Sequence, residues 1–86
     1  MGQFPINMYL VRPDDIVKGM SIFTDDDQNG LGMSEFKVEN HPTQKNNVMT
    51  LECLNVDLQI EETIQINLRQ PREIFTSKLV NSWRKI

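Results

Sequence analysis

The side chains that most often perform chemistry in proteins are scarce in this sequence. There is one histidine, His41, which precedes a proline in a polar stretch, and one cysteine, Cys53, which lies in a segment of alternating apolar and polar residues. A catalytic cysteine needs a base beside it, and a zinc site needs several such ligands. We therefore expect a solvated His41, a Cys53 packed in the core, no catalytic residue and no cofactor.

An acidic stretch supplies the sharpest local motif. Asp25, Asp27 and Asn29 alternate and precede a glycine, as do the oxygen ligands in the first half of a calcium loop. The second half is missing, because Phe36 stands where the last glutamate is required and no helical pattern precedes the motif. Successive carboxylates followed by glycines are typical of exposed turns. We expect a solvated acidic hairpin loop that holds no metal.

Charge is distributed unevenly along the chain. Residues 1–66 carry four basic and eleven acidic side chains, whereas residues 67–86 carry five basic and one acidic. Either the basic end lies across the acidic body, or one of the two surfaces recognises a charged partner. The acidic candidates for binding a partner protein are Asp14, Asp15, Asp25, Asp26, Asp27, Glu61 and Glu62. The basic candidates for binding nucleic acid are Arg69, Arg72, Lys78, Arg84 and Lys85.

Length and composition indicate a single folded domain over residues 1–86. Charged residues make up 24% and hydrophobic residues 38%, which is too apolar a balance for a disordered chain. A domain of this size buries only about 60 to 65% of its unfolded surface, so an enclosed catalytic cavity is not expected. The single cysteine favours a reducing compartment, and no segment resembles a signal peptide or membrane span. These features predict a cytoplasmic protein without membrane contact.

The stretch from Val48 to Leu68 is the part around which the fold must form. Apolar and polar residues alternate there as in a half-buried antiparallel strand pair. The alternation slips after Cys53, which predicts a bulge or tight bend near Leu54 and Asn55. The residues expected to be buried are Leu51, Val56, Leu58, Ile64 and Ile66.

Shorter elements surround this pair. Strands are expected over residues 4–11 and 20–24, around Phe36 and Val38, and at Ile74, with polar turns between them. The last ten residues change to a helical period, in which Leu79, Val80, Trp83 and Ile86 share one face. This pattern predicts a short C-terminal helix, capped by Thr76 or Ser77, whose Trp83 plugs one end of the core.

The run from Arg12 to Phe75 resembles the small SH3-like β-barrel proteins encoded in many bacteriophage and bacterial genomes. Lys18-Gly19 opens a strand, and segments such as Val48–Leu54 and Ile64–Leu68 follow in a similar rhythm. The long polar loops and the lack of an aromatic ligand-binding cluster depart from that family. The resemblance implies a mainly β fold, a small antiparallel barrel or half-barrel roll of five to six short strands, and it transfers no binding site.

These observations predict a non-enzymatic interaction protein. We expect a phage or bacterial accessory or inhibitory factor that binds a partner protein through its acidic loops and a sheet edge. The alternative is a small nucleic-acid-binding protein that uses the basic C-terminal segment. Homodimerisation through an unpaired sheet edge is a further arrangement that the sequence leaves open.

Overall fold

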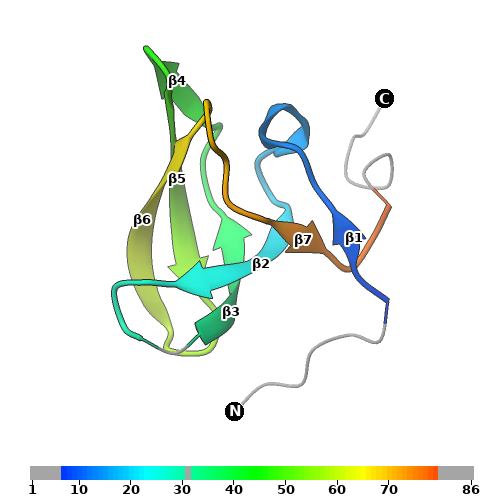
Figure 1. Cartoon of the computed structure of the whole chain (residues 1–86). Coiled ribbons are helices and arrows are strands. Elements are labelled where there is room, and N and C mark those ends of the chain that lie inside the picture. Colours follow the sequence, from blue (N-terminus) through cyan, green and yellow to red (C-terminus); the bar gives the residue numbers. More distant parts are fainter. Residues whose placement is uncertain (1–6, 31, 80–86) are drawn as a thin grey trace.

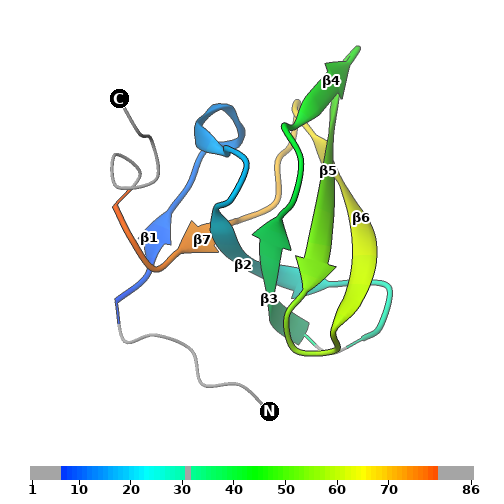
Figure 2. The same ribbon diagram turned by 180° about the vertical axis from the view of Figure 1, so that it is seen from behind.

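The computed structural model describes residues 7–30 and 32–79, which form a curled antiparallel sheet (Figure 1). Its elements are β1 (Tyr9–Leu10), the 3-10 turn η1 (Pro13–Asp15), β2 (Ser21–Asp26), β3 (Gly32–Val38), β4 (Thr43–Lys45), β5 (Val48–Asn55), β6 (Ile60–Asn67) and β7 (Phe75–Thr76). The strands curve into a half-barrel, as the view from behind also shows (Figure 2). The expected mainly β, antiparallel architecture is confirmed.

The first and last described strands, β1 and β7, are neighbours in the sheet. The sheet runs β1-β7-β2-β3-β5-β4, and β6 pairs with the other side of β5. The longest pairing is the β5–β6 hairpin, in which Val48 faces Asn67 and Asn55 faces Ile60. β7, the last described strand, lies between β1 and β2, with Phe75 opposite both Leu10 and Phe23.

The core is formed by the apolar side chains that alternate along the strands. Because successive side chains of a strand point to opposite faces, β5 and β6 each contribute every second residue. The core cluster consists of Val11, Ile16, Met20, Ile22, Phe36, Val38, Met49, Leu51, Cys53, Ile64, Ile66 and Ile74. Its members come from every long strand and from both ends of the described chain, so the half-barrel has a single hydrophobic centre.

The predicted phase slip is absent, and a turn replaces it. β5 keeps one alternation through Asn55, whose side chain is fully buried, and residues 56–59 then form the turn into β6. Leu51, Ile64 and Ile66 are buried as predicted, but Leu58 is 40% exposed and Val56 only half-buried. The prediction for Leu58 was wrong because the inward position after Cys53 is taken by a polar residue.

The C-terminal helix is not supported by the described residues. Thr76 lies in β7 and its hydroxyl donates to the carbonyl of Ser21 at 2.8 Å, so it does not cap a helix. Residues 77 and 78 form a bend, and residues 80–86, with Trp83, Arg84 and Lys85, lie outside the described part, as do residues 1–6. No helix within residues 7–30 and 32–79 is long and apolar enough to cross a membrane.

Candidate functional site

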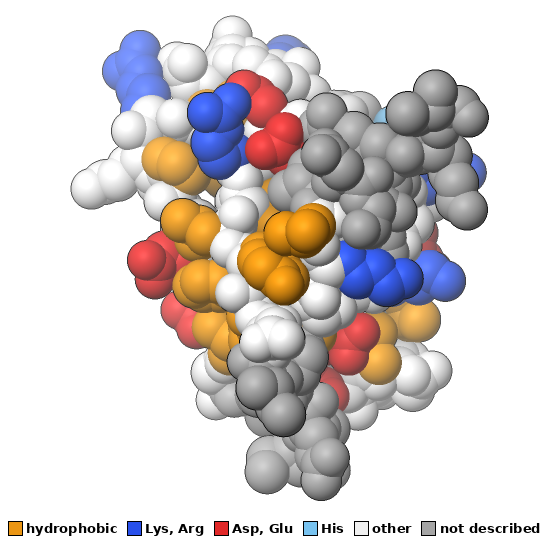
Figure 3. Space-filling model, turned by 90° about the vertical axis from the view of Figure 1, so that its right-hand side faces the viewer, with side chains coloured by type: hydrophobic (Ala, Val, Ile, Leu, Met, Phe, Trp, Pro, Cys, Tyr) orange, Lys and Arg blue, Asp and Glu red, His pale blue; other side chains and the backbone are white. Residues whose placement is uncertain are grey.

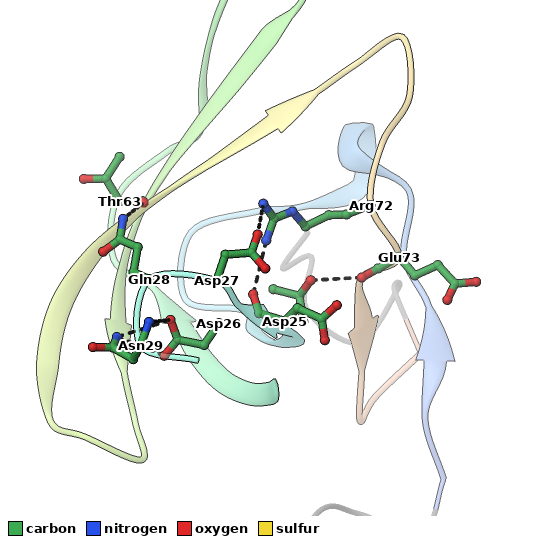
Figure 4. Close-up of polar contacts among 9 residues, drawn as sticks. Asp25, Asp26, Asp27, Gln28, Asn29, Thr63, Arg72 and Glu73 are labelled. Atoms are coloured by element: carbon green, nitrogen blue, oxygen red, sulfur yellow. Dashed lines mark hydrogen bonds and ion pairs between the residues drawn. The ribbon is translucent and has the colours of Figure 1, made fainter. Parts of the chain in front are cut away.

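A buried polar network joins the ends of β2, β5 and β6. The amide nitrogen of Asn55 donates to Asp26 Oδ2 and to Glu62 Oε2, each at 2.8 Å. The amide of Asn29 donates to the same Glu62 oxygen at 2.8 Å. It also donates to Asp26 Oδ2 at 3.1 Å (Figure 4). Asp26 and Glu62 are 2% and 8% exposed. Two carboxylates predicted to face a partner are therefore turned inward and held by amide donors.

The Asn55 side chain makes three hydrogen bonds in this network. Its two N–H groups serve the two carboxylates, and its Oδ1 accepts from the backbone N–H of Leu58 at 3.1 Å. The same side chain thus fixes both the network and the turn into β6. Sequence reasoning missed Asn55, although a signal was present: it continues the inward positions of Met49, Leu51 and Cys53, and a polar residue there must find partners.

The acidic turn, residues 25–30, comprises the end of β2 and the turn that follows it. Hydrogen bonds and an ion pair connect it to the segment that follows β6. Arg72 Nη2 lies 2.9 Å from Asp27 Oδ2, and Arg72 Nη1 donates to the carbonyl oxygen of Asp25 at 3.1 Å (Figure 4). The Thr24 hydroxyl donates to the carbonyl of Glu73 at 3.0 Å. Arg72, a candidate for nucleic-acid binding, is thereby engaged with the acidic body of the protein itself.

The ligands of the calcium-like motif are directed to different partners. β2 extends to Asp26, so the expected loop is shorter than predicted and the turn proper covers residues 27–30. Asp27 pairs with Arg72, while Asn29 turns its amide nitrogen toward Asp26 and Glu62. Among the described residues, no group of three His, Cys, Asp or Glu side chains is placed to hold a metal ion.

A groove of about 510 Å³ opens between the acidic turn and β6. One side carries Asp25, Asp27, Gln28 and Arg72, the other carries Thr63, Ile64 and Gln65, and the buried Asp26, Phe36 and Glu62 complete the lining. Gln28 Nε2 reaches across to the carbonyl oxygen of Thr63 at 3.5 Å (Figure 4). The groove is the seam at which the half-barrel stays open between the ends of β2 and β6.

One edge of β6 borders this groove. In the part of the chain that the structure describes, β6 pairs with β5 alone. The carbonyl of Thr63 points to Gln28, away from β5, whereas the N–H of Leu68 bonds to the carbonyl of Asn47 on the β5 side. Because backbone groups of successive strand residues point to alternate sides, Glu61, Thr63 and Gln65 present their N–H and C=O groups at the open edge.

The remaining charged candidates do not gather into one surface. Asp14 and Asp15 lie in η1, which is well separated from β6 in both ribbon views (Figures 1 and 2). Arg69 lies beside the β4–β5 turn, and Lys78 is exposed beyond β7. Arg84 and Lys85 lie outside the described residues. Of the predicted acidic candidates, the fold thus brings four together at the groove, namely Asp25, Asp26, Asp27 and Glu62.

The two residues considered as catalysts have the surroundings expected of structural residues. His41 is exposed in the segment before β4. Cys53 is 1% exposed, and burial, followed by the nearby carboxylates of Glu39 and Glu62, raises the pKa of its thiol to about 12. The thiol therefore stays protonated at neutral pH and acts as a small apolar side chain. The prediction of a core role for Cys53 is confirmed.

Three carboxylates approach one another on the outer face of the sheet. Glu39, Glu52 and Glu61 line a shallow hollow of about 260 Å³, in which Asn40 donates to Glu52 at 2.6 Å. Loss of hydration and then repulsion by Glu61 raise the pKa of Glu39. The folded protein thus binds a proton at Glu39 more readily than the unfolded chain does. Ionised Glu39 opposes folding, and this opposition disappears as the pH falls through the raised pKa.

We expect Glu39→Gln to raise the melting temperature at pH 7, because it removes a charge that repels Glu61. The gain should shrink as the pH falls and be lost below pH about 4, where the carboxylate of the parent protein is protonated. Thermal unfolding followed by circular dichroism at both pH values measures it, with the exposed Glu73→Gln as the matched control. A gain of equal size at both pH values would show that charge repulsion is not its cause.

Some apolar side chains remain exposed. Tyr9, Leu10 and Leu79 are 37%, 62% and 59% exposed. Hydrophobic side chains also lie at the centre of the face seen in Figure 3. No family model, curated protein sequence or solved structure matches this chain.

Proposed function

We propose that this protein is a non-enzymatic binding module whose groove beside β6 receives a basic segment of a partner protein. The observation that carries the proposal is the charge of the groove. Among its lining residues are the four carboxylates of Asp25, Asp26, Asp27 and Glu62 and a single guanidinium, that of Arg72. A groove with an excess of one charge attracts segments of the opposite charge and speeds their encounter.

The roles of the carboxylates in such a site differ. Asp25 and Asp27 are exposed and would meet the partner first, whereas Asp26 and Glu62 are buried and hold the groove in shape. Asp27 already pairs with Arg72, and its side chain is 70% exposed. Arg72 is half-buried, so only the Asp27 end of the pair is fully exposed. Ion pairs that reach solvent contribute little to stability, so a basic residue of the partner could replace Arg72 at low cost.

The alternative function, nucleic-acid binding by the basic end, is favoured by no contact within residues 7–30 and 32–79. Arg72 is engaged with Asp25 and Asp27, Arg69 lines a separate hollow beside the β4–β5 turn, and Lys78 is exposed beyond β7. The SH3-like relationship, the accessory or inhibitory role in a phage or bacterial cell, and the cytoplasmic location stay predictions from sequence.

We expect the double variant Asp25→Asn/Asp27→Asn to capture its partner about tenfold more slowly than the parent protein at low salt, because charges that steer the encounter are lost. The tagged protein would be used for capture from a cell lysate with and without nuclease treatment. Mass spectrometry would identify the partner, and association kinetics would then be measured with it. A matched control with the same change in net charge is Asp14→Asn/Glu73→Gln, since both of its residues are exposed and neither lines the groove.

Equal association rates for the two double variants would contradict the proposal. If the captured material disappeared after nuclease treatment and was lost on changing Arg69 and Arg72 instead, the nucleic-acid function would replace it.

A further inference from the structure

We infer that the segment bound in the groove is extended and adds to β6 as a further antiparallel or parallel strand. This inference rests on the proposed function and specifies how the partner is held. Its basis is the edge of β6, an eight-residue strand that within the described chain has β5 as its one partner. A strand edge next to a groove is the arrangement that recognises extended peptides through their main chain.

The backbone groups needed for this pairing are already in place. Glu61, Thr63 and Gln65 alternate with residues that bond to β5, so their N–H and C=O groups are directed to the edge. Gln28 Nε2 occupies the place where a backbone N–H of the bound strand would donate to the Thr63 carbonyl oxygen. The two atoms are 3.5 Å apart, so this hydrogen bond is long and weak. A backbone N–H of a bound strand can therefore displace Gln28 with little loss.

The groove also determines which side chains the added strand should carry. Side chains of neighbouring strands alternate in phase, so every second residue of the bound segment would enter the groove, beside Glu62 at one position and beside Ile64 and Phe36 at the next. The first position favours Lys or Arg, and the position two residues away favours an apolar side chain. The outward positions between them would lie over Glu61 and Thr63, where polar or basic residues fit.

A second copy of this chain is a poorer occupant than a basic peptide. Pairing two β6 edges would bring the exposed Asp25, Asp27 and Glu61 of both molecules into one interface. Like charges gathered in one interface repel each other and disfavour the complex. Charge complementarity therefore selects a basic partner.

The test uses the full chain labelled with ¹⁵N and a synthetic peptide of about eight residues. Every second residue of the peptide is Thr, and the positions between are filled by Lys and Val in turn. Binding should slow the hydrogen exchange of the Glu61, Thr63 and Gln65 amides at least about tenfold, while Glu62 and Ile64, already bonded to β5, change little. Two further peptides carry N-methyl groups on one or the other alternate set of amides. The peptide methylated on the amides that face β6 should bind at least about tenfold more weakly than the unmethylated peptide. The peptide methylated on the other set should bind as the unmethylated peptide does.

Each other outcome overturns the inference in a recognisable way. If the peptide binds but both methylated forms bind equally and the exchange of the three amides is unchanged, attraction by charge remains and strand addition is wrong. If those amides are protected in the free protein and sedimentation shows a dimer, a second copy covers the edge. If no peptide binds at millimolar concentration, strand addition fails, and the capture experiment with the Asp25→Asn/Asp27→Asn variant decides separately whether the groove has a partner.

Discussion

Replacing Leu51 by alanine is expected to lower the free energy of unfolding by about 2 to 5 kcal/mol. Leu51 is fully buried on β5, and its partner across the hairpin is the buried Ile64. Truncation removes apolar contacts and leaves a cavity that the surrounding strands cannot close completely, because they are fixed by their hydrogen bonds. For a domain whose total stability is of the order of 5 to 15 kcal/mol, this loss is large.

The matched control is Leu58→Ala, which deletes the same atoms from a residue that is 40% exposed in the β5–β6 turn. Its cost should stay below about 1 kcal/mol. Urea denaturation of both variants measures the difference between them. Similar losses for the two variants would mean that Leu58 belongs to the core, as the alternation of the sequence had predicted, and would contradict the position of the turn.

The second large effect is expected for Asn55→Asp, which should cost about 3 kcal/mol or more. The substitution hardly changes the shape of a fully buried side chain, but it replaces the nitrogen that donates to Asp26 and Glu62 by an oxygen. Both carboxylates lose a donor and face a third carboxylate at the distance of a hydrogen bond. Inside a protein such repulsion is poorly screened by solvent.

Asn46→Asp makes the same chemical change at an exposed site and serves as the comparison. Asn46 lies in the turn between β4 and β5 with φ 57°, a conformation that aspartate also tolerates. Its denaturation midpoint should stay close to that of the parent protein. If Asn55→Asp unfolded at the same urea concentration as Asn46→Asp, the buried network would have no role in stability.

The central hairpin could be predicted from sequence because period-two alternation is a local signal. Met49, Leu51 and Cys53 on one strand and Ile64 and Ile66 on the other are buried as the pattern indicates. The position of the turn could not be predicted in the same way. Counting apolar residues placed the next core positions at Leu54 to Ile60, whereas the buried positions at this end of the hairpin belong to Asn55 and Glu62. Their burial depends on Asp26 and Asn29, which are distant in sequence.

The candidate site could be predicted only in part, because some of its features have local sequence signals and others depend on residues distant in sequence. Turn-forming residues located the acidic segment, but they do not show how far β2 extends. The strand continues to Asp26, and its alternation turns that side chain inward while Asp25 stays exposed. The ion pair of Asp27 with Arg72 and the nearness of Gln28 to Thr63 arise from the curvature of the whole sheet. Contacts of this kind follow from the folding of the whole sheet and have no local signature in the sequence.

The position of β7 has a consequence for how the protein acquires its structure during synthesis. β7 lies between β1 and β2, although it follows all other described strands in the sequence. The ribosome therefore makes β1 long before the strand that binds it exists. The hairpins β2–β3 and β5–β6 need only neighbouring segments and can form early, whereas β1 must wait for Phe75 and Thr76. Until then the segment Tyr9–Leu10 has no strand to pair with, and a chaperone could recognise its exposed apolar side chains.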